Sequence, residues 1–170
     1  MGSTPKAEGS VSRSRVTMLE EEGEVAADYL EEFLDIADLD GDIEIDVEHG
    51  RAALAIVADD NSAINHLVGR DGATLEALQE LTRLAVQAKT GERSRLMLDI
   101  AGFRAQRKVE LGQLAKDAIA KVEASGEPLK LDPLNAFERK VVHDVVTAAG
   151  LISESHGVDP NRYIEITPAK

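Results

Sequence analysis

The sequence contains no cysteine. This absence excludes disulfide bonds, a thiol nucleophile and a thiolate metal site, so the fold must be stabilised by packing. The four histidines show no metal-ligand spacing such as a HExxH pair. We therefore predict no metal and no other cofactor.

Long apolar runs and aromatic residues are also scarce. No stretch approaches the roughly 18 to 20 apolar residues of a transmembrane helix, and the start, MGSTPKAEGSVSRSR, lacks the apolar middle of a secretory signal. We therefore expect a cytoplasmic protein. Tryptophan is absent and aromatic residues make up 3% of the chain, which argues against a platform of aromatic rings on which bases stack. Apolar residues still account for 43% of the 170 residues, enough to bury a core.

Basic residues are outnumbered, and the net charge is −13. Such a charge argues against a polyanionic partner, because binding of nucleic acid rests on phosphate neutralisation by Lys and Arg. The excess of acidic residues is confined to the N-terminal part, however. Residues 1–60 hold 4 basic and 17 acidic residues, whereas residues 61–170 hold 15 of each. Residues 61–110 carry 8 basic and 6 acidic residues and are locally basic. The charge therefore does not exclude nucleic acid as a partner of the later part.

Apolar periodicity and Gly/Pro punctuation predict an α+β protein of two domains. Residues 1–20 are rich in Ser, Gly, Thr and Pro and are expected to form a disordered tail. The first domain is expected over residues 21–125 and the second over residues 126–170, because the breaker cluster SGEP lies between them. In the first domain the patterns predict a helix over residues 24–41, strands over 42–48 and 51–58, and a short helix ending at Leu67. They then predict a long helix over 73–91, a strand over 94–102 and a linking helix over 103–125.

Helical spacing and capping signals give more specific expectations for two helices. In the long helix of the first domain, the buried stripe is expected to consist of Leu75, Leu78, Leu81, Leu84 and Ala85. In the second domain, after the short extended segment PLKL, Asp132 is expected to cap a helix whose first position is Pro133 and which ends at Gly150. Two strands around the turn GVDPN then complete the chain.

The stretch LVGRDGATLEAL places two glycines three apart, between the short helix and the long one. Glycine tolerates unusual backbone angles and lets another backbone approach closely. The N–H groups of such a turn, the positive start of the helix at Ala73 and the charge of Arg70 would suit an anion. The four letters of the GxxG pattern alone also fit a purely structural turn.

In its context, after two strands and before a third, this turn resembles the GxxG loop of the KH domain, an RNA-binding fold. The helix and hairpin ahead of the loop are similar to the type II arrangement, α-β-β-α-α-β. The resemblance implies a mixed three-stranded sheet backed by helices, with a single strand of nucleic acid in a groove beside the loop. It places Gly69, Arg70, Asp71 and Gly72 at the clamp positions, where Asp71 adds a negative charge beside the expected phosphate.

The segment NAFERKVVHDVV places Arg139 and His143 four residues apart on one face of a helix, largely away from its apolar side. Both are therefore expected at the surface, and a solvated helix face is the plain alternative to a binding site. With GVDPNRYIEI downstream, the pattern resembles the R-three-H domain, a small α/β fold associated with single-stranded nucleic acid. The resemblance implies that Arg139 contacts phosphate and that His143 adds a hydrogen bond or a base contact, with Lys140 and Arg162 as helpers.

A KH domain joined by a helix to an R-three-H domain resembles the bacterial Jag family, also called SpoIIIJ-associated protein. The resemblance covers residues 24–167 and implies a short form without the additional N-terminal domain of that family. It implies a non-catalytic cytoplasmic protein that binds single-stranded RNA, with single-stranded DNA as the alternative ligand. It also implies post-transcriptional regulation and a small single-KH protein as partner.

Two other classes of function are weighed against this expectation. The acid of residues 1–60 suggests a protein-interaction adaptor, linked to cell elongation or division, whose acidic helix docks a basic partner; a solvated helix face explains the same acids. An enzyme is disfavoured, because no set of nucleophile, base and orienting group is readable and no phosphate-binding GxxxxGK loop is present. His143 and Asp144 are adjacent on a helix, so their side chains diverge.

Overall fold

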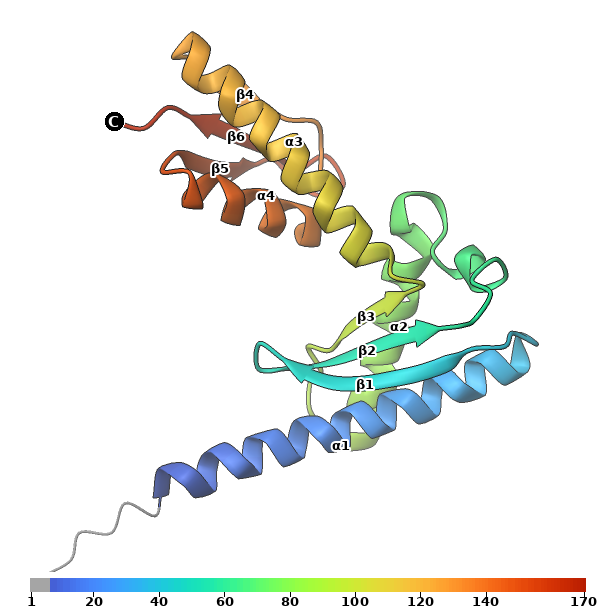
Figure 1. Ribbon diagram of the computed structural model, residues 1–170. Helices are drawn as coiled ribbons and strands as arrows, with labels where there is room; N and C mark the ends of the chain where they lie inside the picture. The colour runs from blue at the N-terminus through green and yellow to red at the C-terminus, as the bar shows by residue number, and fades with distance from the viewer. Residues whose placement is uncertain (1–6) are drawn as a thin grey trace, which may run out of the picture. The chain divides into compact units, whose positions relative to one another are not determined.

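The computed structural model describes residues 7–170, which divide after Phe103 into two compact units, residues 7–103 (unit 1) and 104–170 (unit 2). The expected α+β class is confirmed, with a mixed three-stranded sheet in unit 1 and a second sheet in unit 2 (Figure 1). Across residues 7–170, no helix combines the length and the apolar character that crossing a membrane requires.

Unit 1 contains three strands and two long helices. The strands are β1 (Asp42–Glu48), β2 (Arg51–Val57) and β3 (Met97–Ile100), and the helices are α1 (Ala7–Ile36) and α2 (Ala73–Thr90). Between β2 and α2 the chain forms two short 3₁₀ turns, η1 (Ile64–Leu67) and η2 (Arg70–Gly72).

The sheet of unit 1 has the order β1-β2-β3, with β1 antiparallel and β3 parallel to the central β2. Strand β2 alternates between buried and half-buried residues, and Ala52, Leu54 and Ile56 all face the core. Because side chains alternate across a strand, these residues share the face that α1 and α2 cover. The turn between β1 and β2 is formed by His49 and Gly50, both with positive φ, as a two-residue hairpin requires.

Unit 2 combines two helices with an antiparallel sheet of order β4-β6-β5. Its elements are α3 (Phe103–Ser125), β4 (Leu129–Lys130), α4 (Ala136–Ala148), β5 (Ile152–His156) and β6 (Tyr163–Thr167). Ile164 and Ile166 of β6 are fully buried against both helices. The strands predicted around GVDPN are thereby confirmed.

The boundary between the units differs from the predicted one near residue 125. Helix α3 buries a row of apolar residues in the core of unit 2, together with β6 and α4, so it belongs to that unit and is not a linker. That row consists of Leu111, Ala115, Ala118, Ile119 and Val122. Glycine and proline at residues 126–128 therefore mark a turn inside a unit.

The predicted disordered tail over residues 1–20 also needs correction. Helix α1 extends back to Ala7, so residues 7–20 are helical, and only residues 1–6 of that prediction lie outside the described residues. The segment from Ser10 to Glu22 contains neither proline nor glycine, and nothing in it stops a helix once α1 has formed.

The buried face of α2 is rotated from the predicted stripe. Leu75 and Leu78 are buried as expected, but Leu81 and Leu84 are each 52% exposed, and the polar residues Gln79 and Thr82 are buried along with Val86. The buried polar groups are satisfied: Gln79 Oε1 accepts from the Leu98 backbone N–H at 3.0 Å, and Thr82 Oγ1 donates to the Leu78 carbonyl at 2.7 Å. Because both polar side chains keep a hydrogen bond, their burial costs little free energy, and α2 can place this face against the sheet.

Helix α4 begins three residues later than predicted. Residues 131–134 run beside β6, since Leu131 N–H donates to the Ile164 carbonyl and Leu134 N–H to the Arg162 carbonyl. The cap is Asn135, whose side chain accepts from the Glu138 N–H, while Glu138 accepts from the Asn135 N–H. This reciprocal capping box replaces the predicted cap at Asp132.

Candidate nucleic-acid interface

The GxxG turn of unit 1 requires both of its glycines. Gly69 has φ +73° and ψ −174°, a conformation open in practice only to glycine, and a Cβ there would lie 2.1 Å from Thr74 Oγ1. Gly72 has φ +81°, and a Cβ there would lie 2.8 Å from the Phe103 ring. The first glycine thus makes room for the start of α2, and the second for the aromatic ring that follows β3.

Between the two glycines, Arg70 and Asp71 are both exposed at the start of α2. Asp71 has φ 54° and ψ 26°, a left-handed conformation that aspartate and asparagine tolerate better than most residues. The Leu75 N–H donates to the Val68 carbonyl at 3.1 Å and closes the loop. Gly72 supplies no side-chain cap to α2, so the positive end of this 18-residue helix is covered only by backbone.

Arg139 does not occupy the exposed position expected of it. Its side chain is only 12% exposed, and Nη1 donates both to the Leu134 carbonyl and, at 2.9 Å, to Asp159 Oδ1. It therefore ties the start of α4 to the loop between β5 and β6. The prediction that the Arg139 guanidinium faces solvent is wrong. Because α4 begins only at Ala136, the Leu134 carbonyl lies just before the helix and accepts a hydrogen bond from the guanidinium.

His143 is exposed, as predicted, and its ring is held in place. Its Nδ1 shares a hydrogen bond with the hydroxyl of Ser153, a buried residue of β5. Among the described residues, Nε2 of this ring makes no hydrogen bond, so it is the ring nitrogen without an internal partner. The structure thus separates Arg139 and His143 into an internal and an external group.

The two helper residues also differ from each other. Lys140 is exposed and pairs with Asp144 one turn along α4, with Nζ to Oδ1 2.7 Å. Arg162 is half-buried, and its Nε is buried without a hydrogen bond among the described residues. Neither residue was predicted to be paired or buried.

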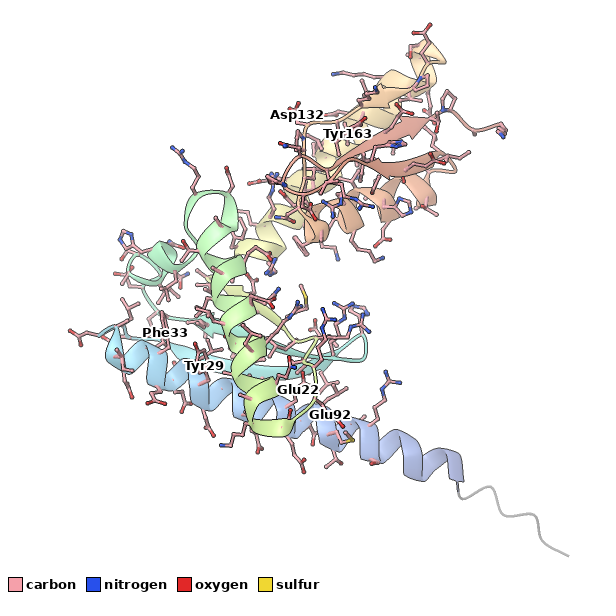
Figure 2. All side chains as sticks on the ribbon, turned by 180° about the vertical axis from the view of Figure 1, so that it is seen from behind. Glu22, Tyr29, Phe33, Glu92, Asp132 and Tyr163 are labelled. Carbon is pink, nitrogen blue, oxygen red and sulfur yellow. The ribbon has the colours of Figure 1, made fainter. Side chains whose placement is uncertain are left out.

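One group of residues in unit 2 was missed at the level of sequence. The rings of His156 and Tyr163 lie 5.7 Å apart on neighbouring strands, and the ammonium of Lys130 lies 5.9 Å from the Tyr163 ring centroid. Tyr163, labelled in Figure 2, alternates with the buried Ile164 and so points to the other face of the sheet. The period-two pattern of YIEIT was the available signal for this aromatic position.

Comparison with known proteins identifies one domain of this chain and several relatives. The R-three-H domain matches residues 109–168, within unit 2 and including most of α3. RNA-binding protein KhpB of Clostridium symbiosum is 28% identical over 144 residues, 84% of this chain and 64% of the relative. The protein of the same name from Bacillus subtilis is 32% identical over 104 residues, 59% of this chain and 50% of the relative.

A third protein of that name, from Lactiplantibacillus plantarum, is 28% identical over 84% of this chain and 44% of its own length. The chain thus spans between 44% and 64% of these three relatives. The chain thus contains an R-three-H domain and is similar to proteins named RNA-binding protein KhpB, which agrees with the resemblance to the Jag family stated from the motifs.

Proposed function

We propose that this protein is a non-catalytic RNA-binding protein that holds a single strand through the GxxG turn of unit 1 and the exposed face of α4 in unit 2. The observation that carries the proposal is the GxxG turn itself. Two glycines with positive φ present Arg70 at the start of α2, which has no side-chain cap, and exposed N–H groups beside a cation suit a phosphate of the strand backbone. The relatives are named RNA-binding protein, which supports the same function.

The clamp assignment rests on unit 1 being a type II KH domain. Its order, helix, hairpin, interrupted helix and parallel strand, supports that assignment, and the GxxG turn interrupts the helical segment where a KH clamp is expected. In this proposal Gly69 and Gly72 allow the strand backbone to approach, Arg70 neutralises a phosphate, and Asp71 weakens the contact by its charge.

In unit 2 we propose different roles for the residues of the Arg-x3-His pattern. His143 Nε2 and the Lys140 ammonium contact the strand from the exposed face of α4. Arg139 is a positioning residue, because its donors are taken by Leu134 and Asp159. Arg162 supplies a cation beside β6 that has no partner for its Nε among the described residues.

The protein is expected to bind single-stranded RNA more tightly than an RNA duplex of the same length. Both proposed sites contact exposed backbone and bases, whereas a duplex presents its bases only in the grooves. Fluorescence anisotropy titrations at one fixed salt concentration would compare the two ligands and, as a third arm, single-stranded DNA. Equal or tighter binding of the duplex would refute the single-strand proposal.

Changing the charge of the clamp should change affinity in both directions. Asp71→Asn removes the negative charge and keeps a residue suited to the left-handed conformation, so RNA binding should tighten by about twofold to fivefold at low salt. Arg70→Asp should weaken it by a similar or larger factor. Since both side chains are exposed, neither variant should shift the thermal unfolding midpoint by more than about 2 °C. Unchanged affinity for both variants would show that no phosphate lies beside the GxxG turn.

The adaptor alternative has less support in the structure. Helix α1 buries Leu30 and Leu34 in the core of unit 1, so it is a structural element and not a free docking helix. Its exposed acids, such as Glu24, Asp28 and Glu31, form a solvated face. We retain post-transcriptional regulation and a small single-KH protein partner as proposals, which co-purification of RNA and protein from cells would test.

A further inference from the structure

Four arginines gather in unit 1 at a place that the proposed clamp does not use. A cavity of about 290 Å³ is lined by Arg51, Arg83, Arg93, Ser94 and Arg95. These residues come from the start of β2, from the middle of α2 and from the connection between α2 and β3. We call this group the arginine pocket.

The sheet register explains why these arginines meet. Ala53 of β2 pairs with Met97 of the parallel strand β3. Arg51 and Arg95 each lie two residues before that pair, and a step of two residues keeps both side chains on the same face. The pairing of β2 with β3 therefore places the guanidinium groups of Arg51 and Arg95 at the same end of the sheet.

The remaining cations are brought to the same end by α2 and its connection to β3. Arg83 Nε donates to the Leu96 carbonyl at 2.8 Å, which holds its guanidinium over the connection. Both Arg83 and Arg51 also direct a nitrogen at Met97 Sδ, at 3.7 and 3.8 Å. Two guanidinium groups thus approach the same sulfur atom, and two positive charges held so close together favour an anion beside them.

The nearby acids do not pair with three of these arginines. Glu22 of α1 accepts a hydrogen bond from the Ser94 hydroxyl, and Glu92 lies in the connection between α2 and β3; both acids are labelled in Figure 2. Among the described residues, Arg51, Arg93 and Arg95 form no ion pair with either carboxylate or with any other. Arg93 and Arg95 are exposed, so their donors face solvent.

We propose that the arginine pocket binds a phosphate group of the RNA strand and gives unit 1 a second site for the strand backbone. This inference rests on the proposed RNA binding. Guanidinium groups match phosphate oxygens in pairs, and a concave site lined by several of them suits a compact oxyanion. Arg51 begins β2 and Arg95 precedes β3, whereas Gly72 of the GxxG turn lies beside Phe103, which follows the end of β3. Because β2 and β3 are parallel, the pocket and the turn lie toward opposite ends of these strands. One strand crossing unit 1 would therefore meet a cation site at each end.

The test removes the two exposed arginines. Arg93→Gln with Arg95→Gln should lower affinity for a long single-stranded RNA by roughly fivefold, and should reduce the dependence of log affinity on log salt by about 0.7 for each phosphate that is no longer neutralised. The matched control is Lys116→Gln with Lys121→Gln, which changes the net charge equally on exposed positions of α3. Thermal unfolding of both variants should match that of the unmodified chain, because neither Arg93 nor Arg95 has an internal partner among the described residues. Arg51 and Arg83 are left intact because they contact Met97.

Each outcome decides the proposal. A loss of affinity and of salt dependence in the arginine variant alone supports it, and equal behaviour of the two variants overturns it. If the unmodified chain binds no RNA, the proposed function fails, and the pocket is then judged by titration with pyrophosphate followed by thermal shift. Pyrophosphate stabilisation that Arg93→Gln/Arg95→Gln abolishes would assign the pocket to a free phosphate compound and not to a strand. Stabilisation of neither protein, or of both equally, would show that the arginines hold no phosphate.

Discussion

Replacing Gly69 with alanine is expected to lower the free energy of unfolding of unit 1 by about 3 kcal/mol or more. Gly69 has φ +73° and ψ −174°, a region essentially restricted to glycine, and the new Cβ would lie 2.1 Å from Thr74 Oγ1 and 2.9 Å from the Thr74 nitrogen. The backbone nitrogen belongs to the first turn of α2 and cannot rotate away. The start of the helix must therefore shift. Urea denaturation followed by circular dichroism would measure the loss.

Gly91→Ala is the matched control for this variant. Gly91 ends α2 with φ +79° and ψ −2°, and a Cβ there would meet nothing within 4 Å. The control therefore introduces an alanine in the left-handed conformation without a steric clash. This strain alone should lower the free energy of unfolding by about 1 kcal/mol. A Gly69 variant no less stable than the Gly91 variant would mean that the loop relaxes freely, and the close approach at Thr74 would lose its structural importance. If Gly69→Ala stays folded at low temperature, its RNA affinity should also fall, because the clamp has moved.

Replacing Arg139 with alanine is expected to destabilise unit 2 by about 2 to 3 kcal/mol. The substitution removes the donor that satisfies the Leu134 carbonyl, next to the start of α4, and the ion pair with Asp159. The Arg139 side chain is 12% exposed, so little water can replace it, whereas Asp159 is 65% exposed and returns to solvent at small cost. Denaturation of the variant, with the transition of unit 2 resolved from that of unit 1, would give the magnitude.

Two neighbouring variants separate this structural role from RNA binding. Lys140→Ala removes a side chain that is 73% exposed and should change stability by less than about 0.5 kcal/mol. His143→Ala should lower RNA affinity with a smaller effect on stability than Arg139→Ala, since the residue is exposed and loses one hydrogen bond to Ser153. An Arg139 variant of unchanged stability and reduced RNA affinity would instead make Arg139 a direct phosphate ligand.

Much of the fold was readable because its signals are local. The alternation in DIEIDVE and RAALAIV predicted β1 and β2, and His49 with Gly50 predicted the turn between them, because a two-residue hairpin demands positive φ at both positions. The GxxG segment was equally readable, since glycine is recognisable wherever the chain needs a conformation that other residues avoid. The exposure of Arg70, Asp71 and His143 was also predicted correctly, because it follows from a turn and from helical spacing, which are local features of the sequence.

The tertiary structure decided what depends on which surface an element meets. The apolar pattern of α3 shows that it buries one side, but only the presence of β6 and α4 assigns that side to unit 2. On α2, the leucine spacing favoured Leu81 and Leu84 for the core, yet Gln79 and Thr82 are buried, because their hydrogen bonds to Leu98 and Leu78 remove the cost of burying them.

Arg139 and the arginine pocket show the same division between sequence and structure. The spacing of Arg139 and His143 predicted that they share a helix face. The late start of α4 places the Leu134 carbonyl where it accepts a hydrogen bond from the Arg139 guanidinium, and only the structure shows this. Likewise, Arg51 and Arg95 are 44 residues apart in the chain and meet only because β2 and β3 are parallel and in register. Local sequence determined the conformation of turns and strands, while long-range pairing determined which charges are buried, which are exposed and which converge, because those properties belong to two segments at once.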